Sequence, residues 1–153
     1  MTNAKSGNVQ KQELKMQDYI RKVHYYETDK MGITHHSNYI RWLEEARVHF
    51  LNQIGYGYTE LETAGIISPV TAVECQYKHP TTFGDEIKIH IEIEKFTGIK
   101  LLMRYQIADI ATGNLVATAL TVHCFLDKDG RPIPLKKKFP ALEAALKSLS
   151  TQL

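Results

Sequence analysis

The clearest pattern along the chain is an alternation of isoleucine and polar residues between Glu86 and Lys95. Isoleucine occupies every second position, and a lysine, a histidine and two glutamates stand between. A period of two places the two sets on opposite faces of a β-strand. The pattern therefore predicts a strand with one face in the core and one face toward water or a partner. The isoleucines are residues 87, 89, 91 and 93.

A second pattern has helical spacing. Apolar residues stand at positions 39, 42, 43, 46, 50 and 54, and Gly55 follows as a stop signal. This predicts one helix of about four to five turns, with the Ser37/Asn38 pair as its cap. Glu44 and Arg47 lie one turn apart, and we expect them to form an exposed ion pair on the helix surface.

The other segments predict strands on either side of this helix, and a short helix after them. Asp18 to Tyr26 alternates as a strand that leads to Asp29. After about Ser68, turn signals divide the chain into four successive antiparallel strands. Pro140 to Leu149 has helical spacing and is expected to form a short closing helix. The turn signals are His79-Pro80, Gly84-Asp85, Thr97-Gly98, Thr112-Gly113-Asn114 and Asp127 to Gly130.

One of the predicted strands, Leu115 to Leu126, has no strongly polar face, which is typical of a central strand covered on both sides. A single long helix can cover only one face of a five-stranded sheet. The second face is therefore expected to pack against another subunit, which makes the protein a homo-oligomer.

Length and composition fit a single domain of moderate charge. The chain has 153 residues, 43% of them hydrophobic, and a net charge of +2. We expect one domain over residues 16–150, preceded by a flexible segment over residues 1–15. The low net charge argues against nucleic acid as a partner. No apolar run approaches a membrane span or a signal peptide, so a cytoplasmic location is expected.

The candidate chemistry lies between Tyr25 and Trp42. Asp29 stands a few residues before the start of the predicted helix, where backbone N–H groups near His36 and Ser37 have no helical acceptor. A carboxylate beside such donors is a workable site for acyl hydrolysis, because the donors can stabilise an oxyanion. Adjacent histidines at 35 and 36 have no third ligand at recognisable spacing, so no metal is expected. Motifs of serine hydrolases, zinc proteases and phosphate-binding loops are absent from the sequence.

A spaced motif runs from Tyr25 through Thr28-Asp29, Gly32 and His36 to Asn38-Tyr39. It resembles the signature of the 4-hydroxybenzoyl-CoA thioesterase family, in particular its acyl-CoA thioesterase branch associated with the Tol-Pal system. The resemblance covers residues from about 18 to 145 and implies an α+β hotdog fold, in which a five-stranded antiparallel sheet wraps around one long central helix. This chain departs from the family at Lys30 and at Thr34-His35, which border the expected acyl pocket. The matching residues are Tyr25, Thr28, Asp29, Gly32, His36, Asn38 and Tyr39, then Glu44, Ala46 and Arg47, then Tyr77, Pro80, Gly84 and Asp85.

The resemblance implies an acyl-CoA thioesterase in which Asp29 is the central catalytic residue, either as nucleophile or as general base. It places His36 where it helps to orient the thioester or the attacking group, and Tyr25 near the acid. Coenzyme A would be part of the substrate, with no separate cofactor, and its phosphates are expected near Lys100 or the run 136–138. Subunits of this fold join their sheets, so a dimer is the minimal unit, and a homotetramer is expected.

Two other functions remain open from the sequence. A related hotdog enzyme dehydrates 3-hydroxyacyl groups on acyl carrier protein. It uses a histidine in a strand-to-helix turn and an acid inside the long helix of the partner subunit, whereas here the acid precedes the helix, which has only Glu44 and Glu45. A non-catalytic protein that binds acyl thioesters would keep the fold without turnover, although the intact Asp29 argues against it.

Overall fold

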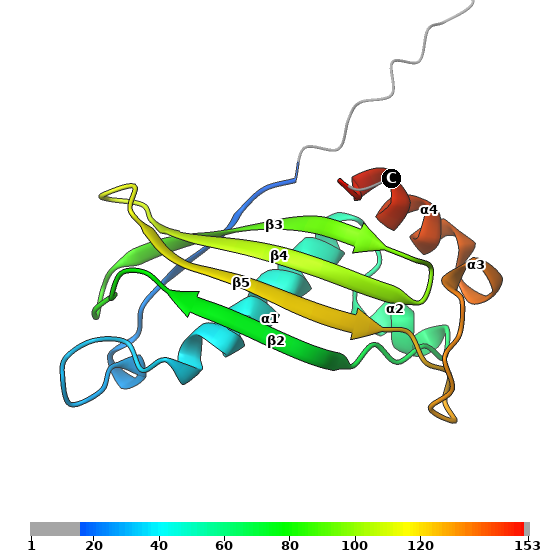
Figure 1. Ribbon diagram of the computed structural model, residues 1–153, viewed down its shortest axis with the longest axis horizontal. Helices are drawn as coiled ribbons and strands as arrows, with labels where there is room; N and C mark the ends of the chain where they lie inside the picture. The colour runs from blue at the N-terminus through cyan, green and yellow to red at the C-terminus, as the bar shows by residue number, and fades with distance from the viewer. Residues whose placement is uncertain (1–15, 152–153) are drawn as a thin grey trace, which may run out of the picture.

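The computed structural model describes residues 16–151, so the expected flexible segment 1–15 lies outside the described residues. The fold is a five-stranded antiparallel sheet in the order β1-β3-β4-β5-β2, with a long helix, α1, across one face (Figure 1). The predicted α+β arrangement is confirmed. The strands are β1 (Tyr19–Lys22), β2 (Val70–Tyr77), β3 (Glu86–Phe96), β4 (Lys100–Asp109) and β5 (Leu115–Cys124). The α-helices are α1 (Ser37–Gln53), α2 (Tyr58–Thr63), α3 (Leu135–Lys138) and α4 (Pro140–Leu149).

The core forms where the two sequence patterns meet. The four isoleucines of β3 are buried, and they face the apolar stripe of α1, in which Trp42 and Leu43 are completely buried. Helix α4, which matches the predicted closing helix, adds Leu142 and Leu146 to the same core. The strand and helix periodicities therefore correctly identified the layers that pack together.

Helix α1 has the predicted length but not the predicted cap. It ends before Gly55, which has a left-handed backbone with φ of +81°. At its start, the Ser37 hydroxyl is engaged by the ring of His35 at 2.8 Å, and the Ser37 amide donates to His35 Nδ1 at 3.2 Å. The Asn38 side chain instead donates to the carbonyl of Glu27 at 2.9 Å. The Ser37/Asn38 cap was therefore wrong, because both side chains bind partners outside the helix.

The first strand is shorter than predicted. β1 ends at Lys22, and Tyr25–Glu27 form a 3-10 turn instead of a continued strand. The carboxylate of Glu27 accepts hydrogen bonds from the His24 amide at 2.8 Å and from Arg21 at 2.6 Å. These two bonds fold the chain back on itself, and a local polar contact has overridden the alternating pattern.

The expected exposed ion pair between Glu44 and Arg47 does not form. Arg47 is only 7% exposed, and its Nη1 donates to the Tyr105 hydroxyl at 3.3 Å, whereas Glu44 points to solvent. Arg47 lies one turn after the buried Leu43 and one residue after the buried Ala46, so it shares the core face of α1. The prediction was wrong because the charge of Arg47 was given more weight than its position on the helix.

Strand β2 forms one edge of the sheet, since it pairs only with β5. β5 lies between β4 and β2, as expected for a central strand, with one face buried against the helix layer and the other half-exposed. Packing of that second face against another subunit stays a prediction. No helix within residues 16–151 is long and apolar enough to span a membrane.

Candidate active site

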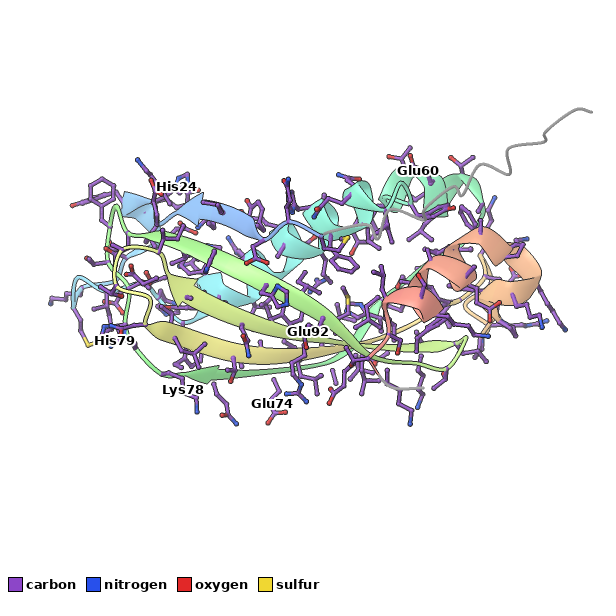
Figure 2. The ribbon with its side chains drawn as sticks, turned by 90° about the horizontal axis from the view of Figure 1, so that it is seen from above. His24, Glu60, Glu74, Lys78, His79 and Glu92 are labelled. Carbon is purple, nitrogen blue, oxygen red and sulfur yellow. The ribbon has the colours of Figure 1, made fainter. Side chains whose placement is uncertain are left out.

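A cleft of about 370 Å³ opens at the end of the sheet where α1 begins. Three segments form it: the loop before α1, the first turn of α1, and the end of β2 with the residues that follow. Figure 2 shows Lys78 and His79 at this end of the molecule. The polar and aromatic residues that line the cleft are Asp29, Thr34, His36, Tyr39, Tyr77, Lys78 and His79.

The loop that carries Asp29 is a tight, well-bonded turn. The Asp29 amide donates to the Ile33 carbonyl at 2.8 Å, and the Gly32 amide donates to the Asp29 carbonyl at 2.9 Å. Gly32 adopts φ of +79°, which favours glycine there. The hydroxyl of Thr82 also donates to the Gly32 carbonyl at 2.8 Å, which ties the loop to the chain beyond β2. Asp29 is thus held in place by backbone contacts.

The Asp29 carboxylate has one oxygen in a structural role and one available. Oδ1 accepts the Met31 amide at 2.8 Å, so the acid does cap its own turn. Within residues 16–151, no donor contacts Oδ2. The half-buried side chain lines the cleft, so Oδ2 can contact a ligand or a water without breaking the turn.

A second acid, Glu27, has a structural role that the sequence did not indicate. Its carboxylate is buried, and in addition to Arg21 and the His24 amide it binds Trp42 Nε1 at 2.7 Å. Burial acts to raise the pKa of this carboxyl, but the three donors outweigh it and lower the pKa below its usual value. Its partners stand 6 and 15 residues away in the sequence, so no local pattern could have identified the contact.

Of the two backbone amides predicted as oxyanion donors, those of His36 and Ser37, one is available. The Ser37 amide is taken by His35, as described above. The amide of the exposed His36 has no acceptor in the described part of the chain. The His36 N–H is therefore the backbone donor that remains free to bind a substrate carbonyl oxygen.

Tyr77, at the end of β2, holds the start of α1 in position. Its hydroxyl donates to the His36 carbonyl at 2.8 Å, and its ring lies edge-on to Tyr39 with 5.0 Å between ring centroids. Burial, together with the nearby Cys75, raises the pKa of Tyr77 to about 12, so the phenol stays protonated and donates at neutral pH. The motif that carries the family resemblance included Tyr77, but no role was predicted for it.

Two of the other proposed site residues lie away from the cleft of their own chain. Tyr25 is 76% exposed and packs edge-on against Phe83. Lys100 pairs with Cys124, whereas Tyr77 pairs with Ala117, seven positions earlier on β5. At about 3.3 Å per residue this separation is roughly 23 Å, so Lys100 lies toward the opposite end of the sheet.

The lysine run 136–138 on α3 also lies at that opposite end (Figure 1). The basic residues that do line the cleft are Lys78 and His79, in addition to His36. The rings of His35 and His36 stack at 4.2 Å, and no group of three or more metal-ligating side chains gathers anywhere in residues 16–151.

Comparison with known protein families identifies one match that spans nearly all of the described domain. Residues 23–148 match the model of the "Thioesterase-like superfamily". The putative acyl-CoA thioesterase YneP of Bacillus subtilis is 37% identical over 119 residues, which cover 77% of this chain and 86% of that protein. The 1,4-dihydroxy-2-naphthoyl-CoA hydrolase of Thermosynechococcus vestitus is 27% identical over 128 residues, covering 82% of this chain and 87% of that protein.

Solved structures agree with these sequence matches. The DHNA-CoA thioesterase from Staphylococcus aureus superposes with a TM-score of 0.81 at 32% identity, covering 86% of this chain and 88% of that one. This likeness confirms the predicted hotdog fold. These relatives are an acyl-CoA thioesterase, a CoA-ester hydrolase and a CoA thioesterase by name, which supports thioester hydrolysis as the general activity.

Proposed function

Because the chain belongs to the thioesterase-like superfamily, we propose that it hydrolyses the thioester of an acyl-CoA to the free acid and coenzyme A, with Asp29 as the catalytic carboxylate. The observation that carries this proposal is the free Oδ2 of Asp29 in a cleft that also holds His36, whose amide has no acceptor. An acid and an oxyanion donor in one cleft are the two groups that acyl transfer needs.

In the proposed reaction, the carbonyl oxygen of the thioester lies against the His36 N–H. Asp29 either attacks the carbonyl carbon to form an anhydride, which water then hydrolyses, or takes a proton from a water that attacks the same carbon. In the first route the C–S bond breaks and the coenzyme A thiolate leaves as the anhydride forms, and water then releases the acid and restores the Asp29 carboxylate. In the second route the C–S bond breaks as the intermediate formed by the attacking water collapses, and the thiolate leaves in that step. Thiols titrate near 8.5, so the leaving group needs no dedicated strong acid.

Coenzyme A enters as part of the substrate, and the proposal needs no separate cofactor. Its phosphates are anionic, and Lys78 and His79 are the basic groups that line the cleft. They replace Lys100 as the proposed contacts from the same chain. Lys100 would contribute to a site only from another subunit, and Tyr25 stays a proposed site residue that does not line the cleft.

We further propose a cytoplasmic homo-oligomer whose minimal unit joins two β2 edges. All but one residue of β2 are exposed, including Val70, Val73 and Tyr77, and an unprotected apolar edge is a template for strand pairing. Tyr77 ends this strand and also lines the cleft, so the interface would adjoin the active site. Light scattering should give a mass of at least twice 17.5 kDa, and Val73→Lys should reduce the mass to that of a monomer.

The finer classification remains a proposal. The acyl-CoA thioester hydrolase YbgC of Escherichia coli is only 24% identical, over 120 residues. Membership of the Tol-Pal-associated branch therefore stays a prediction. The dehydratase alternative is disfavoured by the two helix acids: Glu45 is bound to Tyr19 and Arg21, Glu44 is exposed, and neither lines the cleft.

The decisive experiment is hydrolysis of a panel of short, long and aromatic acyl-CoA esters by the wild type and Asp29→Asn, followed by release of free thiol. Asparagine keeps an oxygen that can accept the Met31 amide, so the turn is preserved while the negative charge is lost. We expect kcat/KM to fall at least about a hundredfold.

Asp127→Asn is a matched control. Asp127 caps its own turn through the amides of Asp129 and Arg131, as Asp29 does through Met31, but it lies just beyond the end of β5, away from the cleft. Its variant should hydrolyse esters at the wild-type rate. Equal rates in wild type and Asp29→Asn would remove Asp29 from its role, and no turnover of any ester would favour the binding-only alternative.

A further inference from the structure

A chain of buried polar groups crosses the interior between α1 and the sheet, about ten residues along α1 from the cleft. Arg47 Nη1 donates to the Tyr105 hydroxyl at 3.3 Å, Tyr105 contacts the Thr121 hydroxyl at 2.6 Å, and Thr121 contacts His123 Nε2 at 2.8 Å. All four residues are buried. At 1.5 Å per residue, Arg47 lies roughly 15 Å from the start of α1, so the group is separate from the candidate active site.

Giving every hydroxyl proton of this chain an acceptor favours one tautomer of His123. The guanidinium of Arg47 can only donate, so the Tyr105 oxygen accepts from it. The Tyr105 proton then goes to Thr121 at 2.6 Å, because its alternative acceptor is the weak sulfur of Met103 at 3.9 Å. Thr121 in turn donates to His123 Nε2. The His123 proton therefore lies on Nδ1, which becomes a hydrogen-bond donor.

Both ends of this chain present a donor without a partner. Arg47 is more than nine-tenths buried, and its Nε has no acceptor in the described residues. His123 is 3% exposed, and within residues 16–151 its Nδ1 contacts no acceptor either. A buried donor without an acceptor is rare in proteins and costly, so Arg47 Nε–H calls for an acceptor. His123, which lines the same cavity, can supply a second donor from Nδ1.

The charge of the group is a single positive one. Burial acts to lower the pKa of Arg47, but the oxygens of Tyr105 and Tyr58 outweigh it and raise the pKa, so the guanidinium stays charged. Burial, and then the charge of Arg47, lower the pKa of His123 to about 4, so the imidazole is neutral at pH 7. No carboxylate in residues 16–151 forms an ion pair with Arg47.

A small cavity lies beside these donors. Arg47 and His123 both line it, the rest of its wall is mainly apolar, and its free space of about 20 Å³ suits one very small occupant. Tyr58, Leu61 and Ser68 line both this cavity and a larger surface hollow of about 240 Å³. These shared residues form the wall between the cavity and the surface hollow.

We propose that this cavity binds a small monoanion, a halide or a formate-sized carboxylate, between Arg47 Nε–H and His123 Nδ1–H. One negative charge neutralises the one buried cation, and the anion accepts both unpaired hydrogen bonds. Charge-assisted bonds of this kind are the stronger ones in proteins. The apolar wall and the small volume exclude phosphate and larger acids. The site serves neither Asp29 nor the thioester, so it stands whether or not hydrolysis is found.

Two measurements on the wild-type protein test the site. Calorimetric titration with sodium bromide and with sodium formate, at an ionic strength held constant with gluconate, should show saturable binding of at least one of them. Anomalous diffraction from bromide-soaked crystals should place bromide within hydrogen-bonding distance of Arg47 Nε and His123 Nδ1. Competition between the two anions shows whether the natural occupant is a halide or a carboxylate.

Variants distinguish this site from surface binding. Arg47→Met should weaken the binding at least about tenfold. Arg104→Met should leave it unchanged, since that arginine is exposed and pairs with Glu94 at 2.8 Å. Asp29→Asn should also bind the anion normally. The proposal is overturned by a lack of saturable binding, by bromide found only on the surface, or by a cavity water that bromide does not displace. These wild-type results decide the matter even if Arg47→Met does not fold.

Discussion

Helix α1 carries a polar group at its start and another about ten residues along it, and the two differ in almost every physical respect. The first is an open cleft with a half-buried acid, an unpaired amide and exposed histidines. The second is a sealed group with a cation, two hydroxyls and a neutral imidazole, all buried. An open site can leave groups unpaired because water satisfies them, whereas a sealed site cannot. Changes at the cleft should therefore alter activity, and changes at buried groups should alter stability.

The largest expected effect on stability comes from Glu27, the buried acid near the start of α1. Glu27→Gln removes the more buried of the two carboxylates that pair with Arg21 and leaves Glu45 at 3.1 Å as its remaining partner, so the free energy of unfolding should fall by about 3 kcal/mol. The folded pKa of Glu27 is depressed, so its stabilisation is present above its unfolded pKa and is lost as the pH falls through the folded value. Urea unfolding at pH 7 measures the change. Glu86→Gln, which removes an exposed acid 3.7 Å from Lys22, should cost less than about 1 kcal/mol. An equally small loss in both variants would contradict the structural role of Glu27.

The next prediction concerns the buried group of Arg47, Tyr105, Thr121 and His123, and it tests how the free energy of unfolding depends on pH. The pKa of His123 is about 4 when folded and near 6.5 when unfolded, so the unfolded state binds more protons between these values. The groups facing it are Arg47 and Tyr105, and a second positive charge beside Arg47 is unfavourable. The stability that His123 contributes is complete above about pH 6.5 and is lost, by up to about 3 kcal/mol, as the pH falls toward 4.

Urea unfolding of wild type and His123→Gln from pH 7.5 to 4.5 isolates this contribution, because other groups titrate equally in both. The variant should show the flatter pH dependence. His90→Gln is an opposite control: burial acts to lower the pKa of His90, but Asp18 and Glu92 outweigh it and raise the pKa. Its stabilisation is therefore present below its unfolded pKa and lost as the pH rises through the folded value. Parallel curves for wild type and His123→Gln would show that His123 does not titrate as described.

A smaller effect concerns the position of the oxyanion donor. Tyr77→Phe removes the hydroxyl that holds the His36 carbonyl, an interaction worth about 1 kcal/mol, and we expect kcat/KM to fall about fivefold. Tyr19→Phe removes a hydroxyl that binds Glu45 at 2.8 Å, outside the cleft, and should leave the rate unchanged. Steady-state kinetics of the two variants make the comparison. A full rate in Tyr77→Phe would mean that the start of α1 is positioned without Tyr77.

The smallest effect tests the revised position of Arg47. Because Glu44 is exposed and does not pair with Arg47, Glu44→Ala should change the free energy of unfolding by less than about 0.5 kcal/mol. Urea unfolding at low and high salt measures it. A salt-dependent loss would indicate that the surface ion pair forms in solution after all.

The sequence predicted the fold better than it predicted the site. The alternation in β3 and the helical spacing in α1 are local patterns that repeat over many residues. The buried face of each element could therefore be predicted from the sequence alone. Asp29 and His36 could be located because they lie in one short segment with the helix start. Tyr77, Lys78 and His79 stand about 40 residues later, at and just after the end of β2. Contacts over that distance, such as the hydrogen bond from the Tyr77 hydroxyl to the His36 carbonyl, bring them beside that segment.

By itself, then, the order of residues determined the periodic elements, the glycine turns that bound them and the acid placed before the helix, because these depend on neighbours within a few positions. Tertiary structure decided that Glu27 is buried and Asp29 available, that Arg47 faces Tyr105 instead of Glu44, and that Lys100 lies far from the cleft. Each of these depends on which distant groups meet in space, and the free energy of a polar side chain is set by those partners and not by its place in the sequence.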